Sequence, residues 1–161
     1  MYFSIKDIVV LGGFIFLCLL TGMVSSYFMT DGLQNWYPAL IKSPLSPPDW
    51  LFAPVWTVLY ILMGTAVWLM WRERETQSDT FPVAMTMFLV QLFLNGAWTF
   101  CFFYLQNPVL GLAEIIGLDL ALILTVFVFF KMSRAAGVLL FPYALWLAFA
   151  TYLNGYIVWA N

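Results

Sequence analysis

Amide and indole side chains recur at helical spacing inside three otherwise apolar stretches of this sequence. Residues four apart lie on one face of a helix, so each set would form a stripe. An amide deep in an apolar span needs a partner on another helix or on a ligand. Apolar walls with a few fixed polar groups are typical of a small-molecule site, and aromatic walls suit a flat ligand. The stripes are Trp56, Tyr60 and Gly64; Gln91, Asn95, Trp98 and Phe102; and Tyr143, Trp146, Ala150 and Asn154. Spacing alone accounts equally well for a ligand cavity and for plain helix packing.

Two acidic residues, Glu114 and Asp119, fall within a further apolar stretch. A carboxyl group inside a membrane is a candidate for a proton relay or an ion site. The alternative is a protonated acid that hydrogen-bonds to a neighbouring helix. Because the spans offer no Lys, Arg or His as a partner, we favour this second interpretation.

The residue types give little support to metal chemistry. The chain has 161 residues and no histidine, the usual metal ligand and general base. Cys18 and Cys101 lie in apolar runs without metal-site spacing, and we interpret them as small packing residues. We therefore predict no metal site, no firm catalytic residue and no obligatory cofactor. The net charge of −2 also leaves no electrostatic footprint for nucleic acid.

Composition indicates which elements must position these residues. The chain is 64% hydrophobic and 9% charged, whereas a soluble domain is about half apolar and about a quarter charged. Five continuous apolar runs reach the ~20 residues that a helix needs to cross a bilayer. They cover 8–29, 51–71, 82–105, 109–131 and 135–159. The sequence predicts an all-α membrane protein with one domain, 1–161, folded as a single bundle of five transmembrane helices.

The predicted loop 30–50, which we call the lid, has an unusual composition. Its segment 36–48 carries two aromatic rings, the cation of Lys42 and four of the chain's eight prolines. Proline fixes φ and lowers the entropy lost on ordering. We expect the lid to hold one shape over the mouth of the bundle.

Basic residues are distributed unevenly between the two sides of the predicted bundle. Lys42 stands alone on the side of the lid, and the other five basic residues lie on the opposite side. An excess of Lys and Arg marks the cytoplasmic side. We expect the N-terminus in the cytoplasm of a bacterial cell, although this rule loses its force in an outer membrane. The five residues are Lys6, Arg72, Arg74, Lys131 and Arg134.

Several tryptophans lie near the ends of the predicted spans. Trp and Tyr favour the membrane–water interface, where an amphipathic ring meets both phases. We interpret this group as interfacial rather than as part of a binding site. Its members are Trp36, Trp50, Trp68, Trp71 and Trp159.

Four blocks of the sequence resemble, in order, the TspO/MBR family of bacterial tryptophan-rich sensory proteins and the mitochondrial translocator protein. The first block lies in the lid, and the others lie in the second, third and fifth runs. They are Trp36-Tyr37-x-x-Leu40-x-Lys42-x-Pro44 with Pro47-Pro48; Pro54-Val55-Trp56-Thr57-x-Leu59-Tyr60; Gln91-x-x-x-Asn95-x-x-Trp98-Thr99; and Pro142-Tyr143-x-x-Trp146-x-x-Phe149-Ala150-Thr151-x-Leu153-Asn154.

The resemblance implies a five-helix membrane bundle, often a homodimer, that binds porphyrins and, in some members, sterols and benzodiazepine-type drugs. The implied pocket lies under the lid, and Lys42 could meet a porphyrin propionate at its mouth. A sterol motif that ends in Lys or Arg is incomplete here, because no cation follows Tyr152 or Tyr156. Carried over, the pocket residues are Tyr37, Trp56, Tyr60, Asn95, Trp98, Trp146, Ala150 and Leu153.

Three functions are compatible with these features. The leading hypothesis is a receptor or sensor that binds protoporphyrin IX, or haem, and regulates tetrapyrrole levels. The second is a transporter of porphyrins or sterols, in which an acid of the fourth helix couples movement to protons. The third is light-dependent porphyrin degradation, for which Trp56 and Trp146 would be the candidate residues.

Overall fold

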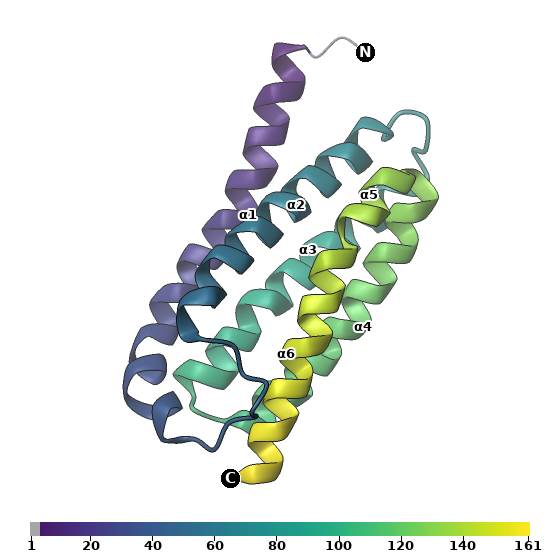
Figure 1. Ribbon diagram of the computed structural model, residues 1–161. Helices are drawn as coiled ribbons and strands as arrows, with labels where there is room; N and C mark the ends of the chain where they lie inside the picture. Colours follow the sequence, from purple (N-terminus) through teal and green to yellow (C-terminus); the bar gives the residue numbers. More distant parts are fainter. Residues whose placement is uncertain (1–3) are drawn as a thin grey trace.

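Five membrane-length helical segments form the fold of the computed structural model, which describes residues 4–161 (Figure 1). The segments are Ile5–Ala39, Asp49–Arg72, Phe81–Tyr104, Pro108–Met132 and Arg134–Ala160. No strand occurs in this part of the chain. The prediction of an all-α bundle of five spans is therefore confirmed. The α-helices are α1 (Ile5–Asp31), α2 (Phe52–Arg72), α3 (Phe81–Thr99), α4 (Pro108–Met132), α5 (Arg134–Leu139) and α6 (Phe141–Ala160).

Local sequence signals set the helix starts. Ser4 and Asp7 form a capping box, in which the Ser4 hydroxyl accepts from the Asp7 amide at 3.2 Å. The Asn107 side chain caps α4 by accepting from the Leu110 amide at 3.0 Å. Pro82 and Pro108 occupy first-turn positions, where a missing N–H costs little.

The first span extends further into the lid than predicted. Beyond Asp31 the chain continues through a π-helical turn, Gly32–Trp36, and a 3₁₀ turn, Tyr37–Ala39. The Asn35 amide donates to the Asp31 carboxylate at 2.7 Å across one turn and so supports this continuation. The prediction of a loop over 30–50 is thus wrong for its first ten residues, which are helical. At the other end of the lid, a 3₁₀ turn, Asp49–Leu51, leads into α2.

The last span is interrupted once. α5 and α6 are separated by Leu140, two residues before Pro142. Proline lacks the N–H that would continue the helical hydrogen-bond ladder. The backbone of Leu140 stays right-handed, with φ −85° and ψ −12°, so the chain crosses the membrane as one segment.

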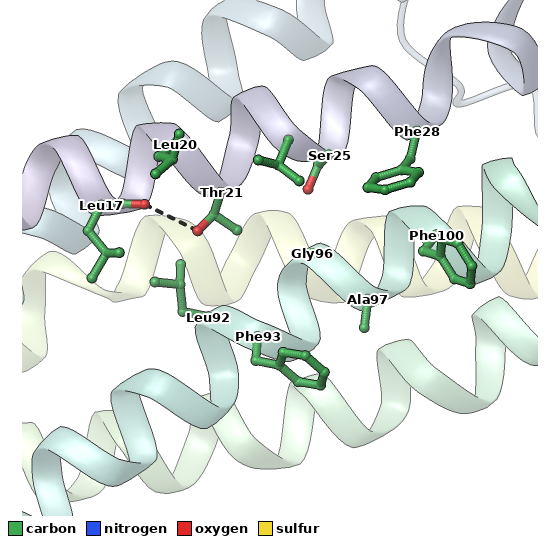
Figure 2. A pocket seen from close by; sticks show the side chains of 11 residues that line it. Leu17, Leu20, Thr21, Ser25, Phe28, Leu92, Phe93, Gly96, Ala97 and Phe100 are labelled. Atoms are coloured by element: carbon green, nitrogen blue, oxygen red, sulfur yellow. Dashed lines mark hydrogen bonds between the residues drawn. The ribbon is translucent and has the colours of Figure 1, made fainter.

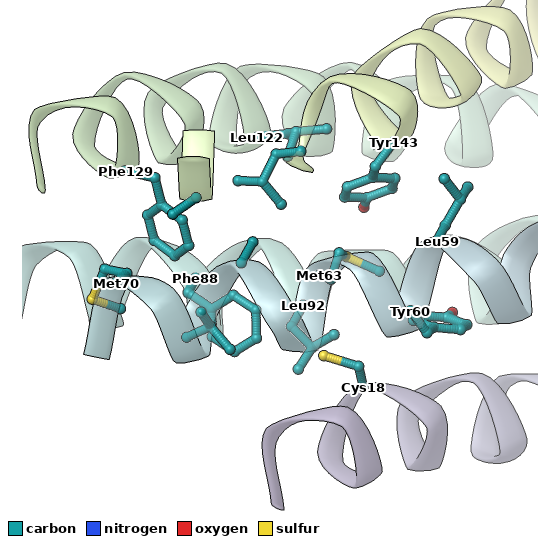
Figure 3. Close-up of a cluster of buried hydrophobic side chains, with 14 of the residues drawn as sticks. Cys18, Leu59, Tyr60, Met63, Met70, Phe88, Leu92, Leu122, Phe129 and Tyr143 are labelled. Carbon is teal, nitrogen blue, oxygen red and sulfur yellow. The ribbon is translucent and has the colours of Figure 1, made fainter. Parts of the chain in front are cut away.

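The core lies between α2, α3, α4 and α6, whereas α1 is largely peripheral (Figure 3). Met63, Phe88, Leu122 and Phe129 are almost completely buried there. α1 reaches this core through Cys18, which is fully buried, as expected for a packing residue. α1 begins at one end of the bundle, and both α1 and α6 end at the other, where the lid also lies (Figure 1).

One interfacial assignment needs correction. Trp68 is only 4% exposed, and the Arg72 guanidinium lies 5.1 Å from its ring centroid. Indole rings suit a helix core as well as an interface, so position near a span end did not distinguish the two. Trp50 and Trp159 do project outward, with 72% and 80% of their surface exposed.

Candidate ligand-binding site

A chain of hydrogen bonds links three helices in the middle of the bundle. The Tyr60 hydroxyl on α2 donates to Asn95 Oδ1 on α3 at 2.7 Å. Asn95 Nδ2 donates in turn to the Tyr143 hydroxyl on α6 at 2.9 Å. All three side chains are buried, so each bond forms away from lipid and from water. Asn95 therefore has the interhelical partners that its position in an apolar span requires.

Aromatic rings surround this chain of hydrogen bonds. The Trp56 ring lies 5.6 Å from that of Tyr60 and 6.0 Å from that of Tyr143, centroid to centroid. Trp146 contacts Phe52 at 5.9 Å, and its indole Nε1 is buried with no hydrogen-bond partner among residues 4–161. The site thus has flat apolar walls and one indole N–H that no described residue satisfies.

A second aromatic cluster lies beneath the lid. Trp98 stacks on Phe102 with centroids 5.3 Å apart, and its indole Nε1 donates to Asn154 Oδ1 at 3.1 Å. The Tyr37 ring packs against Phe103 at 5.6 Å. Asn154 Nδ2 donates to the Pro108 carbonyl at 2.8 Å, so this cluster also ties the start of α4 to α6.

The predicted site residues are accordingly divided between two layers. Trp56, Tyr60 and Asn95 come together in the inner layer, and Ala150 and Trp146 pack against the same core. Tyr37, which belongs to the lid, packs with Trp98 in the outer layer, while Leu153 is buried on α6. The sequence interpretation did not select Tyr143, although it lies in the third stripe. The sequence signal that pointed to such a residue was Asn95, because a buried amide requires a hydrogen-bond partner on another helix.

Polar contacts tie the lid to the last helix. The Ser43 and Tyr152 hydroxyl oxygens lie 3.0 Å apart in a hydrogen bond. The Asn161 side chain accepts from the Ile41 amide at 2.9 Å and donates to the Ile41 carbonyl at 3.1 Å. The Lys42 ammonium lies 4.6 Å from the centroid of the Tyr37 ring, and no described residue forms an ion pair with it.

The two intramembrane acids have different surroundings. Asp119 accepts a hydrogen bond of 2.7 Å from the Thr151 hydroxyl on α6, which is the neighbouring-helix contact that we expected. Both carboxylate oxygens of Glu114 are buried and have no hydrogen-bond partner in the described chain. The amide of Gln91, one turn from Asn95, is also buried and without a partner in residues 4–161. Unpaired buried groups of this kind are costly unless a water or a ligand satisfies them.

A hollow of about 470 Å³ lies elsewhere, between α1 and α3 (Figure 2). None of the predicted pocket residues lines it. In the described residues, no group of three His, Cys, Asp or Glu side chains could hold a metal ion.

Comparisons with known proteins agree over nearly the whole chain. Residues 14–160 match the TspO/MBR family. The chain is 39% identical over 160 residues to the tryptophan-rich protein TspO of Chlorobaculum tepidum, covering 97% of this chain and 98% of the relative. It is 35% identical over 138 residues to the human translocator protein, covering 86% and 81%. It is also 35% identical over 121 residues to the tryptophan-rich sensory protein of Cereibacter sphaeroides, covering 75% and 73%.

Proposed function

Because the chain belongs to the TspO/MBR family, we propose that it is a membrane receptor that binds porphyrins and other flat apolar molecules under the lid. One observation carries the proposal: Trp56 lies against the hydrogen-bonded chain of Tyr60, Asn95 and Tyr143. An apolar ring face beside a few fixed polar groups is suited to a planar ligand. The regulated quantity would be the tetrapyrrole level of the cell.

The unpaired indole N–H of Trp146 supports the same assignment. A buried donor without a protein partner costs free energy, which a ligand acceptor would recover. Trp56 and Trp146 would then act differently, the first by stacking and the second by donating a hydrogen bond.

Lys42 is the proposed contact for a porphyrin propionate. Its ammonium rests on the Tyr37 ring and has no carboxylate partner within the described part of the chain. A charge-assisted hydrogen bond to a propionate at the mouth of the site would pair both ions. As the resemblance implies, we further propose that the protein acts as a homodimer.

The proposal is tested by titrating the purified protein with protoporphyrin IX and following tryptophan fluorescence. The matched probe is protoporphyrin IX dimethyl ester, which has the same ring and no carboxylate. We expect Lys42→Ala to slow association of the free acid and to leave that of the ester unchanged. Absence of saturable quenching by either probe would refute the receptor function.

Glu114 favours a second candidate function, proton-coupled transport. Its buried carboxyl has no partner in the described residues, and such a group inside a membrane is a candidate proton carrier. Proteoliposomes distinguish the two functions, because a transporter moves porphyrin across the bilayer whereas a receptor binds it without flux. Under the transport hypothesis, Glu114→Gln would abolish flux and retain binding.

A further inference from the structure

The hollow between α1 and α3 opens toward the membrane and has an apolar lining. On α1 it extends from Leu17 to Phe28, and on the third span from Leu92 in α3 to Phe100 in the π-helical turn that follows α3 (Figure 2). Leu20, Val24 and Phe93 along it are 40%, 50% and 74% exposed, so the groove is open from the side. Its volume of about 470 Å³ lies within the range of ligand sites.

One polar group in this groove has no partner. Ser25 is 7% exposed, and no described residue forms a hydrogen bond with its hydroxyl. The other hydroxyl in the groove, that of Thr21, already donates to the Leu17 carbonyl at 3.2 Å. A Cβ built on Gly96 would lie 3.5 Å from Thr21 Cγ2 and 3.7 Å from Ser25 Oγ, so these two side chains of α1 face the glycine of α3.

The length of the groove matches one leaflet of a bilayer. From Leu17 to Phe28, α1 rises about 16 Å, close to half of the ~30 Å hydrocarbon thickness. An aromatic cluster marks its outer end, where Phe28 contacts Phe100 and Tyr104, each at 5.6 Å. Tyr104 and Tyr27 are 56% and 81% exposed there, as expected for rings at the headgroup level. Ser25 lies about one turn inside this boundary, within reach of the ester carbonyl of a lipid.

From this match we propose that the groove is a binding site for one phospholipid acyl chain, from the leaflet on the side of the lid. The acyl chain of the lipid lies along α1 and α3 between Leu17 and Phe28, and the Ser25 hydroxyl donates a hydrogen bond to the ester carbonyl of the lipid. Because Gly96 has no side chain, it leaves space for the acyl chain. This site is separate from the proposed porphyrin site and does not depend on it.

The test measures lipid binding by native mass spectrometry of the protein purified in a mild detergent. The probes are dioleoyl phosphatidylglycerol and its diether analogue, which lacks the ester carbonyls. We expect the wild-type protein to bind one diester lipid per protomer about fivefold more tightly than the diether, the equivalent of one hydrogen bond. Ser25→Ala should bind both lipids equally. Ser26→Ala is the matched control, because that hydroxyl is bonded to the Met23 carbonyl outside the groove.

A second pair of variants tests the space itself. Gly96→Leu should weaken binding of both lipids at least tenfold, because the added side chain fills the groove. Gly13→Leu places the same side chain on α1, where a Cβ meets no atom within 4 Å, and should bind lipid normally. Equal lipid binding by the two glycine variants would overturn the proposal. A change from dimer to monomer in Gly96→Leu, with lipid binding unaltered, would instead identify the groove as a contact between copies.

Discussion

Asn95 donates a hydrogen bond of 2.9 Å to the hydroxyl of Tyr143, 48 residues away in the sequence, and accepts another from Tyr60. A single amide thereby joins α3 to both α2 and α6. The two tyrosines can keep this geometry only while the amide stands between them.

Replacing Asn95 by Leu should destabilise the protein by about 2–4 kcal/mol, because two buried hydroxyls lose their partner at once. Thermal unfolding in detergent, followed by circular dichroism, would measure the change. Asn35→Ala removes an exposed amide and should alter stability by less than about 0.5 kcal/mol. A similar loss of stability in both variants would contradict the role assigned to Asn95.

Gly64 allows close packing of α1 on α2, although its place on the Trp56 stripe had suggested a role in the binding face. A Cβ built there would lie 2.6 Å from the Cα of Ile15 on α1, so backbone has to move. We expect Gly64→Ala to lower the unfolding midpoint through this steric clash, by an amount equivalent to about 1–3 kcal/mol. Gly13→Ala has open space and should be neutral. Equal midpoints for the two variants would show that α1 packs on α2 differently.

Cysteine labelling tests the orientation of the bundle. Lys42 lies in the lid before α2 and Arg74 lies two residues beyond the end of α2, so the two positions are at opposite ends of one span. In a background of Cys18→Ala and Cys101→Ser, a membrane-impermeant maleimide should label Lys42→Cys from outside and Arg74→Cys only from the cytoplasm. Labelling of both cysteines from one side would refute the five-span arrangement.

Trp56→Ala and Trp146→Ala should weaken protoporphyrin IX binding about tenfold each, because the first removes a stacking surface and the second a hydrogen-bond donor. Trp50→Ala and Trp159→Ala are the matched controls, since both rings project outward. Trp68 is unsuitable as a control because it belongs to the core. Fluorescence titration would measure affinity, and size-exclusion chromatography would confirm that every variant is folded. Equal loss of affinity in all four variants would place the site elsewhere.

Loosening the lid should accelerate ligand release. Replacing Pro44, Pro47 and Pro48 by Ser increases the entropy lost when the lid orders over a ligand, while the wall residues stay unchanged. We expect a release rate several-fold higher in stopped-flow traces. Substituting Pro82 at the start of α3 provides a control outside the lid. An unchanged release rate would show that the lid is only a connector.

The five spans were predictable because long apolar runs leave the backbone no alternative to helix within a membrane. The continuation of the first helix to Ala39 was not, because Gly32 and Pro38 are residue types that usually mark the end of a helix. It forms where Gly32 lies directly against the Phe103 backbone, a long-range contact with no local signal.

The candidate site could also be predicted only in part from the sequence. Helical spacing places Trp56 and Tyr60 on one face, and an amide such as Asn95 demands a partner. Which group serves as that partner depends on how α6 is rotated, and that rotation follows from packing throughout the bundle. Tyr143 was therefore visible in its stripe without being identified as the partner.

The contact of Asn161 with Ile41 has a practical consequence for measurement. The Asn161 side chain forms hydrogen bonds with both the backbone amide and the backbone carbonyl of Ile41 in the lid. A fluorescent reporter attached behind residue 161 would start beside the lid, whereas one placed before α1 would lie at the far end of the bundle (Figure 1). The first position offers an optical readout of ligand entry but perturbs the contact it reports on. The second leaves the lid intact and is the better site for an affinity tag.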